Sequence, residues 1–179
     1  MAKIASSLER GAQPSRRFAF SLVAVVKGHC WVSLEGEKKP AHAQTGDVFL
    51  LTAPRSFVLA SDLAIEPIDA MGLFSGAGRK TATLGNGRDF SYLGGHVLLD
   101  PTSGRLLADA LPPWIHIEAA SPQATVFRWL LDQLVRERAA DLPGAQLASA
   151  QLAQLLFIQI LRAHLKTSRL LPAGWLRAR

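Results

Sequence analysis

Five histidines are the residues of this chain best suited to binding a metal or transferring a proton. They are His29, His42, His96, His116 and His164, and they are scattered along the sequence. Metal centres and hydrolases are typically marked by short patterns such as H-E-x-x-H, paired C-x-x-C or G-x-S-x-G, and the sequence contains none of these. No pairing of carboxylates for acid–base catalysis can be derived from the sequence either. These residues therefore predict a protein that is not an enzyme and that has no metal or cofactor.

Two further motifs carry little chemistry. Cys30 is the only cysteine and lies in an apolar run, so we expect an inert core thiol in a protein of a reducing compartment. The segment 76–81, Gly-Ala-Gly-Arg-Lys-Thr, lacks the GxxxxGK[ST] spacing of a phosphate-binding loop, and we interpret it as part of a loop.

The charge of the chain is positive, with a formal value of +6 and a pI near 10.1. Much of the excess is in the C-terminal segment, where Arg162, Lys166, Arg169, Arg177 and Arg179 occur without an acidic residue. Cations near the end of a helix are favourable, so this pattern does not by itself indicate a nucleic-acid partner.

Short apolar strands dominate the first half of the chain. The runs 28–34 and 46–51 flank a charged, Pro-containing connection, and we predict that they form the core hairpin of a small β-barrel. Gly28 and Gly46 are expected at sharp bends of the chain. Phe57-Val58-Leu59 and residues 90–99 continue the strand pattern, the latter interrupted by Gly94-Gly95. Several short strands at close spacing favour a barrel or sandwich in a single domain.

The N-terminus has some features of a signal peptide. A basic segment, 1–17, precedes the apolar run 18–26. This run ends without a small-residue cleavage site and is too short to span a bilayer. We therefore predict a mobile arm followed by the first strand, a cytoplasmic protein and no membrane partner.

The second half of the chain is predicted to be helical. Asp100-Pro101 begins one helix, which Pro112-Pro113 ends, and Ser121-Pro122 is predicted to cap a second. The segment 114–117 is predicted to be an apolar connector, and a last helix is expected over 145–166.

The final two helices superficially match a helix-turn-helix, but the last one is apolar over more than one face. We expect no specific DNA binding by this chain alone. One apolar stripe suffices to pack a helix on a barrel, so the excess predicts a homodimer interface with Leu152, Leu155 and Ile158. The alternative is that the preceding helix covers these side chains.

Four segments occur in an order found in a known family. They are Gly46-Asp47-Val48-Phe49-Leu50-Leu51, Tyr92-Leu93-Gly94-Gly95-His96, Leu106-Leu107-Ala108-Asp109-Ala110-Leu111-Pro112-Pro113 and Gly174-Trp175-Leu176. With them, the chain resembles the N-terminal cupin-type regulatory domain of AraC/XylS-family transcription regulators from about Phe18 to Leu176.

The resemblance implies a cupin-like double-stranded β-helix (jelly-roll) barrel followed by α-helices. We accordingly divide the chain into an arm (1–17), a barrel (18–99), C-terminal helices (100–166) and a linker-like tail (167–179). In this family the domain senses a small-molecule effector or mediates dimerisation. DNA would be bound only through a C-terminal domain that this chain does not contain.

The chain lacks the metal ligands of the two cupin motifs at the matching positions. Aligning G-x5-P-x-G-x2-H-x3-N on Gly46 places Phe57 where the histidine ligand would be. Aligning H-x-H-x4-E-x6-G on Gly28 places Pro14, Arg16 and Ser21 at the other ligand positions. The resemblance thus implies a metal-free protein.

We expect an effector site in the barrel mouth, lined by Arg16, Ser21, Val23 and Phe57, with Val23 on the strand face of Ser21. Arg16 would suit an anionic group. Two rival functions stay open: a metal-dependent cupin enzyme that uses His29, His42 or His96, and a purely structural dimerisation cupin.

Overall fold

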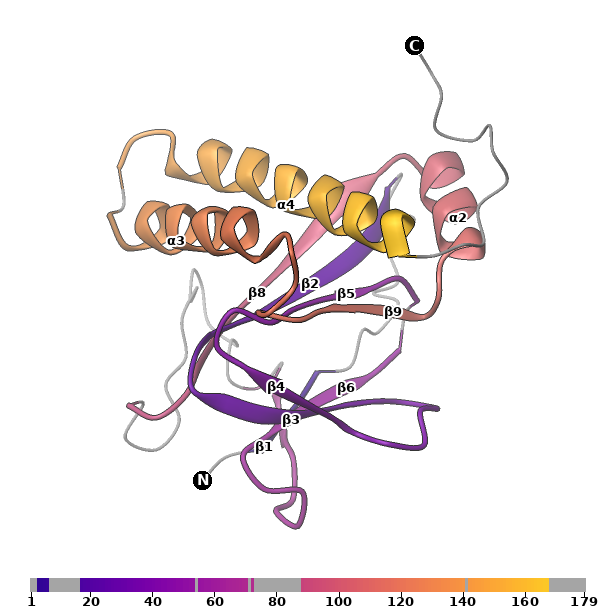
Figure 1. Cartoon of the computed structure of the whole chain (residues 1–179), viewed down its shortest axis with the longest axis vertical. Helices are drawn as coiled ribbons and strands as arrows, with labels where there is room; N and C mark the ends of the chain where they lie inside the picture. The colour runs from indigo at the N-terminus through magenta and orange to yellow at the C-terminus, as the bar shows by residue number, and fades with distance from the viewer. Residues whose placement is uncertain are drawn as a thin grey trace.

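The protein consists of two facing β-sheets and a layer of helices that covers the outer surface of one of them (Figure 1). The computed structural model describes residues 3–6, 17–53, 55–70, 72, 88–140 and 142–167. Sheet A contains, in spatial order, β4 (Ala41–Gln44), β3 (His29–Leu34), β6 (Phe57–Ala60), β1 (Lys3–Ser6) and β7 (Ile68–Asp69). Sheet B contains β8 (Ser91–Leu99), β2 (Phe18–Lys27), β5 (Val48–Leu51) and β9 (Trp114–Ile117).

The strands pair antiparallel, except β1 with β7, which pair parallel. The helices are α2 (Pro101–Ala110), α3 (Ala124–Ala140) and α4 (Ala145–Thr167). The predicted fold class, a jelly-roll-like β-domain followed by α-helices, is confirmed. The two sheets form an open sandwich and do not close into one barrel.

The predicted core hairpin is wrong, because its two strands belong to different sheets. β3 pairs with β4 and β6 in sheet A, whereas β5 pairs with β2 and β9 in sheet B. The short strand β4, which the sequence pattern shows only weakly, takes the hairpin position beside β3. The chain then crosses to the opposite sheet before β5 begins.

The two glycines predicted at bends are confirmed as the corners of the sandwich. Gly28 (φ 82°) separates β2 from β3, and Gly46 (φ 95°) separates β4 from β5, so each lies where the chain changes sheet. The corners are tied together: Thr45 donates its backbone N–H to the carbonyl of Gly28 at 2.9 Å, and Gly46 donates to the carbonyl of Val25 at 2.8 Å.

One hydrophobic core fills the space between the sheets. It combines inward-facing residues of both: Val23, Val25, Cys30, Val32, Leu34, Ala43, Phe49, Leu51, Phe57 and Leu59. The alternation along β3 shows why, since Cys30, Val32 and Leu34 point inward while the residues between them do not. Burial raises the pKa of the Cys30 thiol to about 12, with a further contribution from the charge of Asp47, so the thiol is protonated and unreactive at neutral pH.

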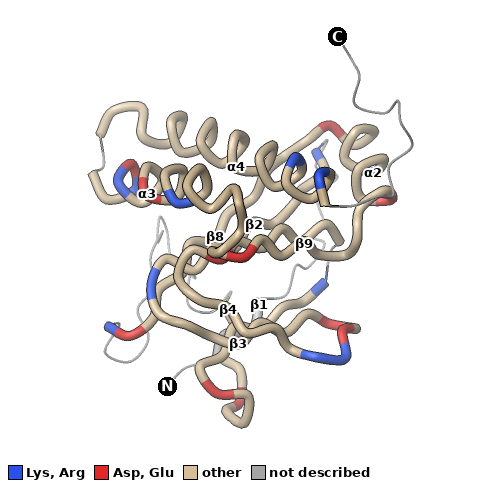
Figure 2. Tube along the Cα trace, in the orientation of Figure 1, with Lys and Arg blue, Asp and Glu red and all other residues tan. Residues whose placement is uncertain are grey.

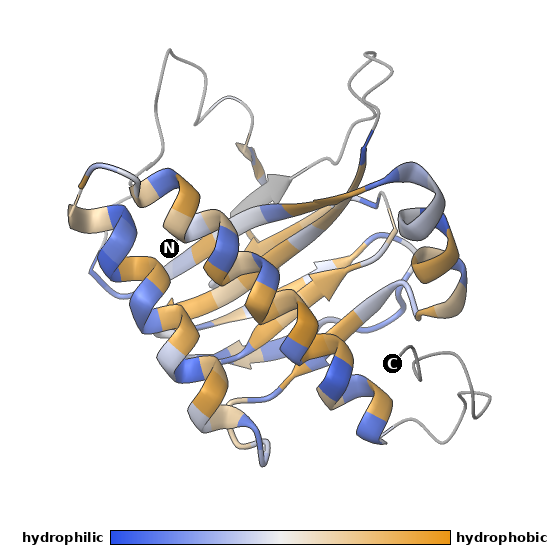
Figure 3. Ribbon diagram, turned by 90° about the horizontal axis from the view of Figure 1, so that it is seen from above, coloured by the Kyte–Doolittle hydropathy of each residue, from blue (hydrophilic) through white to orange (hydrophobic). Residues whose placement is uncertain are grey.

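A second core joins the other face of sheet B to the helices. Its strand residues include Phe20, Leu22, Val48 and Leu50, and α3 and α4 contribute Phe127, Leu130, Leu131, Leu134, Leu156, Phe157, Ile160 and Ala163. Figure 3 shows α3 and α4 lying across the apolar strands, with apolar residues interleaved among polar ones along each helix. Sheet B is therefore buried on both faces, which explains the continuous burial of its central strands, such as β5.

The helix boundaries agree only in part with the predicted caps. Asp100 is the N-cap of α2, where its side chain accepts hydrogen bonds from the backbone of Thr102 (3.1 Å) and Ser103 (3.0 Å), and these bonds lower its pKa. The prediction for the second helix is shifted, because α3 begins at Ala124 after a turn and the Ser121 hydroxyl has no hydrogen-bond partner among the described residues.

Two short strands were not expected. Residues 3–6, which fall in the predicted N-terminal arm, form β1 beside β6, and residues 114–117 form β9 at the edge of sheet B instead of a connector. The segment 76–81 lies outside the described residues, so its interpretation as a loop stays a prediction. Charged residues lie mainly in the loops, on the helices and at strand ends (Figure 2).

Candidate ligand site between sheet B and the helices

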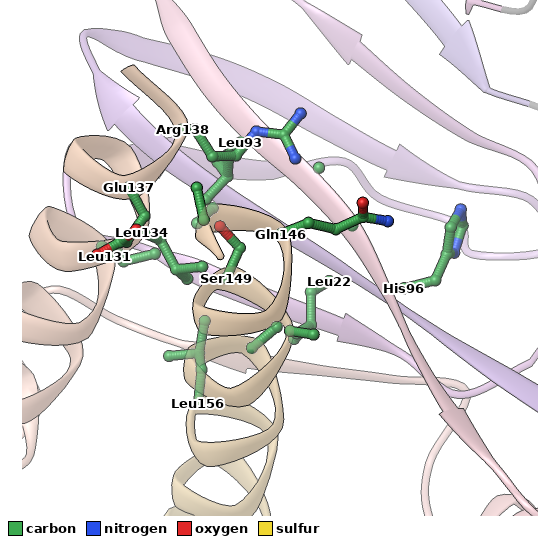
Figure 4. A pocket seen from close by; sticks show the side chains of 16 residues that line it. Leu22, Leu93, His96, Leu131, Leu134, Glu137, Arg138, Gln146, Ser149 and Leu156 are labelled. Carbon is green, nitrogen blue, oxygen red and sulfur yellow. The ribbon is translucent and has the colours of Figure 1, made fainter. Parts of the chain in front are cut away.

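A cavity of about 300 Å³ lies between the outer face of sheet B and helices α3 and α4 (Figure 4). The strands contribute Leu22, Ala24, Leu93, Gly94, Gly95 and His96. The helices contribute Leu131, Leu134, Glu137, Arg138, Ala145, Gln146, Ser149, Ala150, Ala153 and Leu156. This volume is at the lower end of the range for small-molecule sites, and most of these side chains are apolar, which is typical of such sites.

The floor of the cavity is open at Gly95, where β8 has no side chain on the face toward the helices. Gly95 pairs with Leu22 of β2, whose side chain faces the helices, so a side chain at Gly95 would face them too. A Cβ atom placed on Gly95 would meet nothing within 4 Å. Gly94 faces the opposite side of the sheet, where its Cβ would lie 3.5 Å from the Tyr92 ring. The missing side chain at Gly95 and the small side chain of Ala24 thus leave room beneath the helices.

The polar groups of the cavity belong to the ends of the two helices that meet at their connection. Glu137 and Ser149 are half-buried, and Arg138 and Gln146 are exposed. The deep wall consists of Leu22, Leu134 and Leu156, each less than 10 % exposed. The site therefore combines an apolar interior with a rim that can donate and accept hydrogen bonds.

His96 contributes its backbone to the cavity, while its ring lies on the other face of β8. There its Nδ1 is 3.1 Å from the hydroxyl of Ser21, the residue with which it pairs across the strands. Burial lowers the pKa of His96, so the ring is neutral at pH 7 and either partner can be the hydrogen-bond donor. Ser21 and His96 are both candidate site residues in the sequence, but no sequence pattern predicts that they contact each other.

Of the four residues predicted for an effector site, the three that the structure describes, Ser21, Val23 and Phe57, do not line this cavity. Val23 and Phe57 both belong to the core between the sheets, and Ser21 lies on the same face of β2 as Val23. Arg16 falls in a part of the chain that the structure does not describe. An effector site in the barrel mouth, lined by these residues, stays a prediction.

A buried carboxylate that the sequence did not single out as a functional group connects three segments. Asp47 accepts hydrogen bonds from the backbone of Ala119 (2.7 Å) and Gln44 (3.1 Å), and its Oδ2 lies 3.1 Å from Nε2 of His116. The His116 ring stacks on Phe49, with centroids 4.2 Å apart. This cluster fixes the connection between β9 and α3 to the corner at Gly46.

The described residues hold no group of three or more His, Cys, Asp or Glu side chains that could bind a metal ion. Two histidines lie near each other on sheet A, where the ring centroids of His29 and His42 are 5.6 Å apart and those of Trp31 and His42 are 5.1 Å apart. Phe57, at the position of the motif histidine, is buried among apolar side chains. A metal-free protein stays a prediction for elemental analysis to test.

The residues predicted for a dimer interface differ in exposure. Leu155 and Ile158 are 39 % and 43 % exposed, whereas Leu152 is half-buried and packs on the core of sheet B. Trp129 of α3 is also exposed, by 55 %. The predicted interface therefore rests on Leu155 and Ile158.

Within the described part of the chain, no helix is long and apolar enough to cross a membrane.

Comparison with known proteins agrees with this architecture. A relative from Streptomyces antibioticus is 35 % identical over 153 residues, which is 86 % of this chain and 50 % of the relative. A second, from Streptomyces lividans, is 32 % identical over 177 residues, which is 97 % of this chain and 58 % of the relative. Both carry the name "Putative AraC-like transcription regulator".

The chain spans about half the length of these curated relatives. A family model described as "Cupin" matches residues 4–166, from the first strand to the end of α4. With two facing sheets, a jelly-roll-like strand order and this match over most of its length, the chain belongs to the cupin family.

Proposed function

We propose that this chain is the regulatory part of an AraC-type transcription regulator. In this role it dimerises and senses a small-molecule effector in the cytoplasm, and a separate domain binds DNA. The observation that carries the proposal is the alignment with two AraC-like relatives over 86 % and 97 % of this chain, although it accounts for only 50 % and 58 % of their lengths. The relatives therefore contain a further region in which DNA binding can be located.

The packing of the last helices supports regulation instead of DNA recognition. Leu156, Phe157 and Ile160 of α4 are buried on sheet B, so this helix is part of the domain's own core. Its outward residues include Leu147, Leu155 and Ile158, which are apolar and exposed. Gln151, Gln154 and Arg162 of α4 are exposed as well, so it is the burial of the opposite face, and not the polarity of the outer one, that favours a role within the domain over reading a DNA groove.

The same outward face supports dimerisation. A second copy of the chain could cover Leu155 and Ile158 by a two-fold contact in which the same patch meets itself. Neither rival function gains support of this kind. The described histidines form no ligand cluster for an enzyme, and the cavity beneath α3 and α4 supports a sensing role beyond a structural dimer.

A repressor fusion tests the proposal. The chain is joined to a DNA-binding domain that occupies its operator only as a dimer, and expression of a reporter gene is measured. We expect at least tenfold repression by the fusion, and loss of repression on Leu155→Glu. Leu106→Glu is the matched control, because Leu106 is also an exposed leucine (51 %) but belongs to α2 and not to α4. Repression no stronger than with the DNA-binding domain alone would contradict dimerisation.

A further inference from the structure

We propose that the cavity between β8 and helices α3 and α4 binds a small, neutral and largely apolar molecule that carries one hydrogen-bonding end. This inference rests on the proposed regulatory function and adds to it the chemical class of the effector and its location. The location is the helix-facing side of sheet B, not the space between the two sheets.

The space in the cavity comes in part from one absent side chain. On the helix-facing side of β8, the positions before and after Gly95 are filled by the large residues Leu93 and Val97, and on β2 the small Ala24 lies beside Leu22. Gly95 interrupts this row, and a Cβ atom there would meet nothing within 4 Å. Glycine inside a strand weakens it, and often marks a place where another molecule approaches closely. Here the space above Gly95 is bounded by the helices, so a ligand can be enclosed on several sides.

The walls determine what can enter. Leu22, Leu134 and Leu156 present apolar surface, which favours an apolar body because its transfer from water is favourable. An empty apolar cavity would lose the contacts that its lining atoms could make, and occupation restores them. A molecule that fills about 300 Å³ also matches small-molecule sites in size.

The rim determines the charge of the ligand. Glu137 and Arg138 bring opposite charges to the same end of α3, and Gln146 and Ser149 add neutral groups from α4. These two charges cancel, so the rim has no net charge that would favour an anionic or a cationic ligand. Gln146 and Ser149 can each donate and accept a hydrogen bond, which suits a hydroxyl, carbonyl or amide group. We therefore expect a neutral ligand and not a phosphorylated or otherwise highly charged one.

The test uses N-phenyl-1-naphthylamine, an uncharged fluorophore with an apolar body and one N–H group, titrated into the purified chain. We expect saturable binding of one molecule per chain with a micromolar dissociation constant. Gly95→Leu places a side chain in the cavity and should weaken binding at least tenfold. Ser91→Leu is the matched control, because it adds the same side chain to an exposed position of the same strand that does not line the cavity, and its affinity should match the wild type within twofold.

A second blocking variant approaches from the helix side. Ser149→Leu narrows the cavity without changing β8 and should also weaken binding, which keeps the test valid if Gly95→Leu does not fold. Absence of saturable binding, or equal affinity in a folded blocking variant and the wild type, would overturn the proposal. The titration needs neither DNA nor a fusion partner. Failure of the repressor fusion with intact probe binding would therefore refute dimerisation alone, and the reverse result would refute the ligand site alone.

Discussion

At the scale of single residues, Asp47 is the side chain that connects most segments of the fold. Its burial alone would raise its pKa, but the hydrogen bonds from His116, Ala119 and Gln44 outweigh this effect, so the pKa of Asp47 lies below the ordinary value of 3.8. The ionised carboxylate is therefore stabilised in the folded chain. One charge thus holds the turn before β5, strand β9 and the start of the segment leading to α3 in place.

We predict that Asp47→Asn lowers the free energy of unfolding by about 2 kcal/mol at pH 7, because the amide replaces an acceptor by a donor next to buried donors. Asp109→Asn is the control, since Asp109 is exposed on α2 and its change should cost less than about 0.5 kcal/mol. Urea denaturation of both variants and the wild type measures the difference. Equal midpoints for Asp47→Asn and the wild type would contradict the role of the carboxylate.

The same residue predicts how stability depends on pH. A carboxylate whose pKa is lower in the folded than in the unfolded chain stabilises fully above its unfolded pKa, and the stabilisation disappears as the pH falls through the folded pKa. The advantage of the wild type over Asp47→Asn should therefore be constant near neutral pH and shrink below about pH 3.8. Urea midpoints across pH 7 to 3 would show this convergence, and a gap that widens in acid would refute it.

Two glycines with positive φ should respond differently to alanine. Gly144 (φ 85°) has open space around its Cβ position, so Gly144→Ala should cost only the strain of the left-handed backbone, about 1 kcal/mol. At Gly28 (φ 82°) the Cβ would also lie 2.2 Å from the backbone oxygen of Asp89, so the chain itself must move. We expect Gly28→Ala to cost about 3 kcal/mol or more, measured by thermal and urea unfolding. A Gly28→Ala variant as stable as Gly144→Ala would contradict the close approach.

At the scale of elements, α2 is docked through its own glycine. Gly104 is the buried residue of α2, and a Cβ there would lie 2.2 Å from Cβ of Phe18 in β2. The Phe18 ring neighbours Phe20, which in turn contacts Phe157 of α4, with centroids 5.2 Å and 5.3 Å apart. Through these aromatic rings, α2, β2 and α4 form one packed unit.

Gly104→Ala distinguishes helix propensity from packing. In an isolated helix this change stabilises by about 1 kcal/mol, but here the new methyl group overlaps Phe18, and overpacking costs about 1–3 kcal/mol. We expect net destabilisation of about 1–2 kcal/mol in urea unfolding. Arg105→Ala, at the next and exposed position, should change stability by less than about 0.5 kcal/mol. A stabilised Gly104→Ala variant would show that α2 is not held this closely.

At the scale of the whole molecule, α4 presents different faces to the domain and to solvent. Leu156 lines the cavity, while its neighbour Leu155 and, one turn later, Ile158 are exposed. Successive positions of a helix are separated by about 100°, so these residues cannot share the cavity face. The helix that would contact an effector would therefore also carry the dimer interface on its outer side.

We predict that the purified chain is a dimer at about 100 μM, well above a micromolar dissociation constant, and that Ile158→Glu converts it into a folded monomer. The reason is that a charge at the centre of an apolar contact loses its hydration without gaining a partner. Light scattering gives the mass, and circular dichroism confirms that the variant is folded. Leu106→Glu should leave the dimer intact, and a monomeric wild type at this concentration would contradict the interface.

The sequence alone determined the features that depend on local pattern. The fold class, the glycine corners, the N-cap at Asp100 and the extent of α4 follow from alternation, turn residues and helix signals that lie within a few residues of each other. The order of the weak motifs also identified the family. The interruption of β8 by Gly94-Gly95 was a sequence signal for the cavity. The sequence did not show, however, that the missing side chain at Gly95 would lie beneath the helices.

Only the tertiary structure decided which segments meet. Alternation tells which side chains of a strand share a face, but not which strand lies beside it, so β3 and β5 could be assigned to one hairpin although they belong to opposite sheets. The contact of Asp47 with His116 joins residues 69 positions apart, and the cavity forms only when α3 and α4 lie across β8. These features arise from long-range packing of two sheets and a helix layer, and no local pattern in the sequence specifies that packing.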